Sequence, residues 1–247
     1  MIALVAAVPF ESELLSRSLC GSEELPGGFP LVYGDIAGQS VVLLAAGIGK
    51  ANAAAATAIL LSHKKIDALL NFGCGGALPG SGLRVGDLAL AEAEIFGDEG
   101  ALTPGGFLDM EALGLPLHVE TGQRYYNRLL CDRSLAEQVR PLLREFAAEF
   151  GRRLVEGPFV TISCGSGIEK SGRELAARTG GICENMEGAA ILQVCRRFGV
   201  PSLELRGISN RTVDRDLSGW DLKGAAAIAE KAVQRLLERW PGGKADL

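Results

Sequence analysis

Two carboxylates and one amide stand next to apolar runs of this chain, where a folded sheet would present them to a ligand. Glu11 follows the apolar run 2–8, Glu187 opens a helical pattern rich in small residues, and Asn210 ends the run 202–209. A carboxylate can take a proton from water or accept hydrogen bonds from two vicinal hydroxyls, whereas an amide both donates and accepts. Each residue also has a plain structural interpretation, because an acid in a first helical turn stabilises the helix dipole and asparagine is common in turns.

Two glycine-rich segments could bring the backbone close to a ligand. One is Gly47-Ile48-Gly49-Lys50, before an alanine-rich helical pattern, and the other is Gly73-Cys74-Gly75-Gly76, after the apolar run 66–72. The first segment lacks the third glycine of a dinucleotide fingerprint and the Ser or Thr of a P-loop. The N–H groups of the second could bind an oxyanion, a hydroxyl or a water. A tight turn is the alternative interpretation of both.

Met186 and Glu187 together suit a sugar, because a thioether packs on the apolar face of the ring while the carboxylate accepts from hydroxyls. Other candidates for chemistry are few. The six cysteines form no C-x-x-C pair, and the two histidines, His63 and His118, lie in no motif. This pattern excludes a zinc site of standard spacing and disfavours a histidine-dependent nucleophile.

The balance of charge is acidic, since 25 Lys and Arg against 30 Asp and Glu give a net charge of −5 over 247 residues. Such a chain lacks the basic surface that nonspecific nucleic-acid binding needs. No run of 18 apolar residues occurs, so we expect no membrane partner. The apolar N-terminus carries no basic residue before Arg17, and the cysteines are scattered, which together predict a cytoplasmic protein without a secretory signal.

Apolar runs alternate with helical patterns, which predicts a layered α/β domain with its sheet between helices. Ligands bind beyond the carboxyl ends of the strands of such sheets. We expect a long loop at 97–122 with one short helix near 109–113, a single domain at 1–240 and a tail at 241–247. The expected strands are 2–8, 41–46, 66–72, 85–95, 154–162 and 202–209, and the expected helices are 11–20, 51–62, 134–150, 169–179, 187–198 and 218–240, the last with Ser218 as its N-cap.

Five segments in this order resemble the purine nucleoside phosphorylase and nucleosidase superfamily. The likeness runs from residue 1 to about residue 240, and within the superfamily segment 97–101 and Asn210 are most similar to the futalosine hydrolases. The resemblance implies a three-layer α/β sandwich with a central mixed, largely parallel sheet flanked by helices. The matching segments are 47–50, 71–77, 86–87, 185–189 and 208–210.

The resemblance also implies roles for single residues. Glu11 matches the glutamate that activates the attacking water, Glu187 matches the one that binds the ribose 2′ and 3′ hydroxyls, and Met186 lies under the sugar. Trp220 matches an aromatic residue that covers the 5′ substituent. Ile168 stands near a purine-stacking phenylalanine, so the sequence departs from the family there and base stacking is weaker or comes from another residue. The backbone of Cys74 and Gly75 and the side chains of Ile48 and Phe107 complete the expected substrate-binding set.

Position 210 distinguishes the purine base. Adenine-releasing relatives have aspartate there, whereas the amide of Asn210 can donate to both N7 and O6 of a 6-oxopurine. A mismatched base would leave a buried polar group unpaired, at a cost of about 1–3 kcal/mol. Phosphorylases of the superfamily hold phosphate with arginines, but this chain has Asn71 at one such position and no arginine at 9–13. Water is therefore the expected nucleophile.

The resemblance thus implies hydrolysis of the N-glycosidic bond of a 5′-modified purine nucleoside. The nearest match is futalosine, which would release hypoxanthine in menaquinone biosynthesis. It implies no metal or organic cofactor, and a homodimer in which the loop 97–122 reaches the neighbour's site. Three alternatives stay open: a methylthioadenosine/adenosylhomocysteine nucleosidase, a purine nucleoside phosphorylase, and a nucleoside-binding module without turnover.

Overall fold

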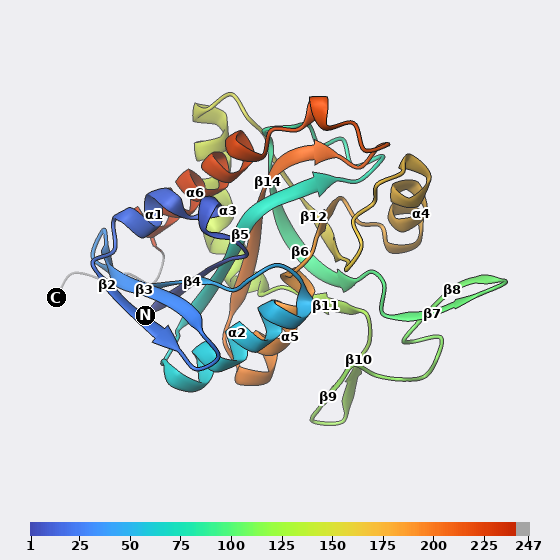
Figure 1. Ribbon diagram of the computed structural model, residues 1–247, viewed down its shortest axis with the longest axis horizontal. Coiled ribbons are helices and arrows are strands. Elements are labelled where there is room, and N and C mark those ends of the chain that lie inside the picture. The colour runs from blue at the N-terminus through green and yellow to red at the C-terminus, as the bar shows by residue number, and fades with distance from the viewer. Residues whose placement is uncertain (241–247) are drawn as a thin grey trace.

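A ten-stranded mixed sheet forms the centre of the computed structural model, which describes residues 1–240 (Figure 1). Its strands are β1 (Ile2–Ala6), β2 (Gly21–Leu25), β3 (Phe29–Ile36), β4 (Gln39–Ala45), β5 (Ala68–Ala77), β6 (Leu88–Phe96), β11 (Arg128–Leu130), β12 (Leu154–Thr161), β13 (Cys183–Asn185) and β14 (Ser202–Arg211). They run in the order β11-β6-β12-β13-β5-β1-β4-β3-β2, and β14 pairs with both β5 and β6. The central strand β5 lies parallel to β1 and β14 and antiparallel to β13.

Helices cover both faces of the sheet, as Figure 1 shows. On one face α2 and α5 pack Ala53, Ala56 and Ile191 against the apolar side chains of the strands. On the other face α3 and α6 bury Val139 and Val233. The predicted three-layer sandwich with a mixed sheet is therefore confirmed. The helices are α1 (Glu13–Arg17), α2 (Lys50–His63), α3 (Arg133–Glu149), α4 (Glu169–Thr179), α5 (Gly188–Phe198) and α6 (Leu222–Glu238), with 3₁₀ turns η1 (Pro9–Glu11) and η2 (Leu217–Gly219).

Most predicted elements are present. The six expected strands appear as β1, β4, β5, β6, β12 and β14, and five of the expected helices as α2 to α6. β1 is buried along its whole length because sheet neighbours and helices enclose it, which explains its unbroken apolar run. α4 ends where Gly180 adopts a left-handed conformation with φ of +68°. The predicted tail at 241–247 lies outside the described residues.

The N-terminal third departs from the prediction in one place. The helix expected at 11–20 is instead the turn η1 followed by the five-residue α1, which buries one side chain, Leu15. The chain then forms β2 and β3, an antiparallel pair at the sheet edge that was not predicted. β2 has only Leu25 buried, so its sequence shows none of the apolar alternation by which a strand is recognised.

The segment 97–122 is not a structureless loop. It forms two hairpins, β7 (Gly100–Thr103) with β8 (Gly106–Asp109) and β9 (His118–Glu120) with β10 (Gln123–Tyr125), which project from the body in Figure 1. The helix expected near 109–113 is wrong, because that stretch is a series of turns. Asn127 accepts from the Met110 N–H at 2.8 Å, and Asp109 accepts from the Ala112 N–H at 2.8 Å.

Two further boundaries differ at the ligand-binding edge of the sheet. The glycine-rich segment 73–76 was expected to follow a strand that ends at residue 72, but it belongs to β5, which runs to Ala77. Asn210 lies inside β14, opposite Gly76, rather than beyond the strand.

α6 is capped by Asp221, whose side chain accepts from the Gly224 N–H, so the prediction that Ser218 is the N-cap was wrong. Within residues 1–240 no helix has the length and apolar character to span a membrane.

Candidate active site

Glu11 is held in a fixed orientation where η1 follows β1. Its Oε2 accepts from the backbone N–H groups of Ala7 and Val8 at 3.1 and 3.3 Å, and its Oε1 accepts from the Cys74 N–H at 2.8 Å. The residue is only 4% exposed. A Cβ at Gly73 would collide with this carboxylate and Gly73 has a φ of +155°, so glycine is needed where β5 passes the glutamate. The glycine-rich segment therefore brings the backbone of β5 against the Glu11 carboxylate, within a strand rather than in a loop.

Glu187 is the N-cap residue of α5 and is buried next to Glu11 in the same group of charges. Its Oε1 accepts from the Gly49 N–H at 2.9 Å, and its Oε2 lies 3.4 Å from Nη2 of Arg206. Gly49 has a φ of +91°, a conformation that other residues rarely adopt, so the turn 47–49 depends on glycine to reach the carboxylate. Burial raises the pKa of Glu187, and the positive charge of Arg206 opposes this effect.

Arg206, which was not predicted as a site residue, joins these groups from β14. It is 2% exposed, and all three of its guanidinium nitrogens are bound: Nε donates to Glu204 at 2.7 Å, Nη1 to the Cys74 carbonyl at 3.1 Å, and Nη2 to Glu187. Asn71 donates to the other oxygen of Glu204 at 2.7 Å. Burial alone would lower the pKa of Arg206, but the carboxylates of Glu204 and Glu187 raise it, so the side chain stays charged.

A second buried glutamate, Glu94, lies next to Glu204. Glu94 accepts from Thr161 Oγ1 at 3.1 Å and from Asn185 Nδ2 at 3.3 Å. A Cβ at Gly188 would collide with the carboxyl oxygens of both Glu94 and Glu204, so the two groups lie together under the first residue of α5. Burial, and then the charge of Glu204, raise the pKa of Glu94 well above its ordinary value. The raised pKa favours the protonated form of Glu94, which can donate to Glu204.

Asn210 lies across β5 from Glu11, at the Gly76 position of the sheet. Ser209 Oγ donates to its Oδ1 at 2.8 Å, and its Nδ2, which lies beside Gly76, donates to the Arg211 carbonyl at 3.3 Å. A Cβ at Gly76 would lie 3.2 Å from that nitrogen and 3.0 Å from Cγ of Glu184. The buried Asn210 amide and the half-buried Glu184 side chain therefore lie next to the same glycine.

Trp220 lies close to the same strands. The next residue, Asp221, donates its backbone N–H to the Ser209 carbonyl at 2.8 Å, and this bond fixes the approach of Trp220 to β14. The indole is half-buried, and the Arg215 guanidinium lies 5.4 Å from its ring centre. Trp220, the aromatic residue expected over the 5′ substituent, therefore lies beside the cluster, and the Arg215 guanidinium lies over its ring.

The thiol of Cys74 reaches the start of α6, with Sγ 3.4 Å from the Leu222 carbonyl. Burial, with a further contribution from Glu11, raises the pKa of this thiol to about 12. Cys74 is therefore neutral, and it contributes to the cluster through its backbone N–H and carbonyl. The neighbouring Gly75 is buried, and a Cβ there would lie 2.5 Å from Cys183 Sγ.

Three predicted binding residues lie at the margin of the cluster. Met186 is half-buried directly before Glu187. Ile48 is 56% exposed between the two glycines of its turn, and Ile168 is 59% exposed at the N-cap of α4. Ile168 has little contact with other side chains, so it is available to a ligand but is not already packed as a base platform.

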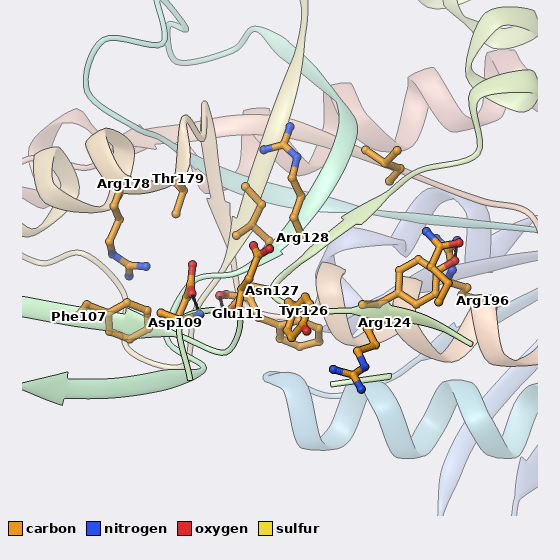
Figure 2. A pocket seen from close by; sticks show the side chains of 16 residues that line it. Phe107, Asp109, Glu111, Arg124, Tyr126, Asn127, Arg128, Arg178, Thr179 and Arg196 are labelled. Carbon is orange, nitrogen blue, oxygen red and sulfur yellow. Dashed lines mark hydrogen bonds between the residues drawn. The ribbon is translucent and has the colours of Figure 1, made fainter. Parts of the chain in front are cut away.

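Phe107 is separated from the cluster within this chain. It lies on β8, where the Arg178 guanidinium stacks 4.2 Å from its ring centre. Both residues line a cavity of about 610 Å³ between the hairpins and α4, which Figure 2 shows. Neither Glu11 nor Glu187 borders this cavity, and neither does Asn210. We assign the candidate site to the carboxylate cluster because buried charged side chains meet there, together with glycines whose positive φ angles bring the backbone close to them.

The charged residues that sequence reasoning missed had a detectable signal. Glu204 and Arg206 interrupt an otherwise apolar run at alternate positions, which places both side chains on one face of β14. Glu94 interrupts the apolar run of β6 in the same way. Charged side chains in a fully buried strand need partners, so two such interruptions indicate a paired cluster. Within the described residues, no group of His, Cys, Asp and Glu has an arrangement that could hold a metal.

The fold and this cluster define an α/β protein whose paired carboxylates lie over the central strand of a mixed sheet. The chain belongs to the phosphorylase superfamily, whose profile matches residues 1–240. It is 35% identical over 214 residues to the futalosine hydrolase of Thermus thermophilus, which covers 87% of this chain and 88% of the relative. It is also 32% identical over 214 residues to a 5′-methylthioadenosine/S-adenosylhomocysteine nucleosidase of Listeria monocytogenes, covering 85% of each.

The structural comparison agrees with the family. The crystal structure of the 5′-methylthioadenosine/S-adenosylhomocysteine nucleosidase from Neisseria meningitidis, in complex with methylthio-immucillin-A, aligns with a TM-score of 0.82 at 28% identity. The alignment covers 96% of this chain and 98% of that one. The predicted membership of the superfamily is confirmed.

Proposed function

We propose that this protein is a nucleosidase that hydrolyses the N-glycosidic bond of futalosine and releases hypoxanthine. The observation that carries the proposal is the convergence of Glu11 and Glu187 on Arg206 and the Cys74 backbone, with the Asn210 amide across the same strand. The similarity to the futalosine hydrolase of Thermus thermophilus supports the same substrate. The remaining product, dehypoxanthinylfutalosine, would enter menaquinone biosynthesis in the cytoplasm.

Two carboxylates divide the work on the sugar. As the bond to the base lengthens, the ribose gains oxocarbenium character, as in other glycoside cleavages. Glu11 takes a proton from the attacking water, and its three backbone hydrogen bonds keep it aimed. Glu187 accepts from the 2′ and 3′ hydroxyls, and its charge favours the cationic sugar. Met186 packs under the ring.

The departing base is stabilised by Asn210. Ser209 donates to Oδ1, and one N–H of Nδ2 donates to the Arg211 carbonyl at 3.3 Å, so the second N–H is the one that would donate toward N7 and O6 of the base. A 6-oxopurine presents acceptors at both atoms, whereas a 6-aminopurine presents a donor beside N7. The amide therefore favours hypoxanthine over adenine as the leaving group.

Water rather than phosphate is the nucleophile in this proposal. The guanidinium of Arg206 is buried and paired with the carboxylates of Glu204 and Glu187, and Asn71 donates to Glu204, so the positive charge here is already balanced by protein groups. The carboxylates of Glu11 and Glu187 would repel a phosphate dianion from the same position. These contacts support hydrolysis over phosphorolysis.

The 5′ end of the substrate would lie between Ile48 and Trp220. Arg215, which lies over the Trp220 ring, is the cation that could pair with the aromatic carboxylate of futalosine. We further propose a homodimer in which the hairpins of segment 97–122 deliver Phe107 to the partner's site. Phe107 lines a cavity that Glu11, Glu187 and Asn210 do not border, which supports this arrangement, and so does the way the hairpins project from the body (Figure 1).

One assay separates the proposal from its alternatives. The protein is incubated with futalosine, inosine or methylthioadenosine, each with and without phosphate, and the released base is measured. Hypoxanthine from futalosine at a rate independent of phosphate supports the proposal. Turnover that requires phosphate would indicate a phosphorylase, and absence of turnover with all three would indicate a binding module.

An adenine-releasing nucleosidase is the second candidate function. It is favoured by the 32% identity to the Listeria monocytogenes nucleosidase and by the alignment with the Neisseria meningitidis structure. Adenine release from methylthioadenosine at a rate comparable to that of hypoxanthine release would establish it and would contradict the role given to Asn210.

A further inference from the structure

Glu94 and Glu204 form a pair of buried carboxyl groups beneath the first residue of α5. Glu94 on β6 is fully buried, and Glu204 on β14 is 2% exposed. A Cβ at Gly188 would lie 2.6 Å from Glu94 Oε2 and 2.0 Å from Glu204 Oε2, so both oxygens face the same small space. Among residues 1–240, Glu94 Oε1 has no hydrogen-bond partner. The proposed hydrolysis uses neither carboxyl group directly, although burying two acids together is costly.

Solvent cannot take the place of the contact between the two acids. They line a cavity of about 10 Å³ together with Asn71 and Ser202, a volume that holds one water at most. A proton shared between two buried carboxyl groups makes one of them a donor and leaves the pair with a single negative charge. Burial, and then Glu204, raise the pKa of Glu94, which favours the proton on Glu94.

One chain of contacts leads from this pair to the side chain of Glu187. Glu204 accepts from Arg206 Nε at 2.7 Å, and Arg206 Nη2 lies 3.4 Å from Glu187 Oε2. Because the guanidinium is planar and rigid, the position of Glu204 sets the direction of Nη2. A shift of Glu204 would therefore move the cation that holds Glu187.

A second chain of contacts leads from Glu94 to the backbone of Glu187. Glu94 Oε2 accepts from Asn185 Nδ2 at 3.3 Å. Asn185 Oδ1 accepts from the N–H groups of Glu187 and Gly188 at 3.0 and 2.8 Å, which satisfies two donors at the start of α5. Glu94 thus contacts both chains, one through Asn185 and the other through Glu204.

We propose that Glu94 is a positioning residue that holds the Glu187 carboxylate in place for the 2′ and 3′ hydroxyls of the ribose. It acts through Asn185 and through the Glu204–Arg206 pair, without touching the substrate. The inference rests on the proposed function, in which Glu187 accepts from those hydroxyls. Loss of Glu94 should therefore weaken recognition of the hydroxyls and leave recognition of the base and of the 5′ substituent unchanged.

The test compares futalosine with 2′-deoxyfutalosine as substrates of wild type, Glu94→Leu and Glu94→Gln. The quantity measured is the ratio of kcat/KM for the two substrates, because the intrinsic reactivity of the deoxy sugar is the same for every variant and cancels in the comparison. We expect Glu94→Leu to lower the ratio by roughly tenfold or more, since a displaced Glu187 loses its bond to the 2′ hydroxyl. Glutamine can accept from Asn185 and donate to Glu204, so Glu94→Gln should stay within about twofold of the wild-type ratio.

A matched control exists on the other side of the fold. Glu230 of α6 is also a buried carboxylate, and it accepts from the Leu15 N–H at 2.8 Å, outside the contacts of Glu187. Glu230→Leu should lower stability and keep the ratio of the two substrates. If Glu94→Leu does not fold, Glu94→Asp takes its place: it keeps the acid but withdraws it by one methylene, and it should lower the ratio by at least about threefold.

Three results would overturn the inference: a Glu94→Leu or Glu94→Asp variant that keeps the wild-type ratio, a Glu94→Gln variant that lowers the ratio as much as Glu94→Leu does, or a Glu230→Leu variant that lowers it equally. Failure of the proposed function is recognised separately. A wild-type protein that releases no hypoxanthine from futalosine contradicts the proposed substrate. The same comparison then uses methylthioadenosine and its 2′-deoxy form, or their dissociation constants where there is no turnover, and the expectation for Glu94 is unchanged.

Discussion

At the scale of single residues, the site depends on one buried cation shared among carboxylates. Arg206 bonds to Glu204 and Glu187, and Glu94 supports Glu204 as a protonated acid. Removal of one partner of a buried ion pair leaves an uncompensated charge, which typically costs about 3–5 kcal/mol. The two glutamates behind the arginine should therefore respond very differently to the same substitution.

Glu94→Gln should change the pH dependence of stability without changing the fold. The folded pKa of Glu94 is raised, so the folded state binds this proton more tightly than the unfolded state does. Stability from this proton is present below the unfolded pKa and is lost, by about 1.4 kcal/mol per pH unit, as pH rises toward the folded pKa. Urea unfolding of wild type and Glu94→Gln from pH 5 to pH 8 measures the difference. If the free energy of unfolding changes with pH in parallel for the two proteins, Glu94 is not protonated in the folded protein.

Glu204→Gln provides the contrasting case, because it replaces the anion that bonds to Arg206 at 2.7 Å. We expect a loss of stability of about 3–5 kcal/mol at pH 7, well beyond that of Glu94→Gln. Thermal and urea unfolding check this order. Equal losses for the two variants would contradict the assignment of charge within the pair.

At the scale of elements, strand β5 and its neighbours account for most of what sequence reasoning missed. The apolar runs predicted β5 and β14, but they did not show that both strands continue through the glycines and Asn210. Glycine weakens a strand pattern in isolation, and only the side chains of neighbouring strands, such as Cys183 beside Gly75, explain its use there. The hairpins of segment 97–122 were missed because their strands are three or four residues long and mostly exposed.

Gly207→Ala tests how closely elements approach one another. A Cβ at Gly207 would collide with the Ala225 carbonyl of α6, which is backbone and cannot rotate away. We expect a loss of stability of about 1–3 kcal/mol, as for other overpacked sites. Gly105→Ala, whose nearest neighbour would be Thr103 Oγ1 at 3.7 Å, serves as the control and should change stability by less than about 0.5 kcal/mol. A Gly207→Ala protein as stable as the control would refute this packing.

At the scale of the whole molecule, the sequence predicted the layers and three of the residues that converge, Glu11, Glu187 and Asn210. It could not predict the cluster that links them, because the partners of Arg206 and Glu204 are defined only once β14 pairs with β5. The place of Phe107, outside its own cluster, leads to the proposed dimer.

Mixing two inactive variants tests that dimer. Glu11→Gln lacks the proposed base, and Phe107→Ala lacks the residue that the partner would deliver. If Phe107 acts across the dimer, subunit exchange creates mixed dimers with one intact site, and activity should recover to about a quarter of the wild-type value. Recovery is measured as hypoxanthine release from futalosine after the two variants are unfolded and refolded together. No recovery would mean that Phe107 does not act in the partner's site.

The most direct test of the central claim is hypoxanthine release from futalosine by wild type and by Glu11→Gln, with futalosine binding measured on the same samples. We predict rapid release by the wild type and a fall of at least about 100-fold in kcat for Glu11→Gln, as expected when a general base is lost, while the dissociation constant changes little. A Glu11→Gln protein that releases hypoxanthine at the wild-type rate would contradict the account.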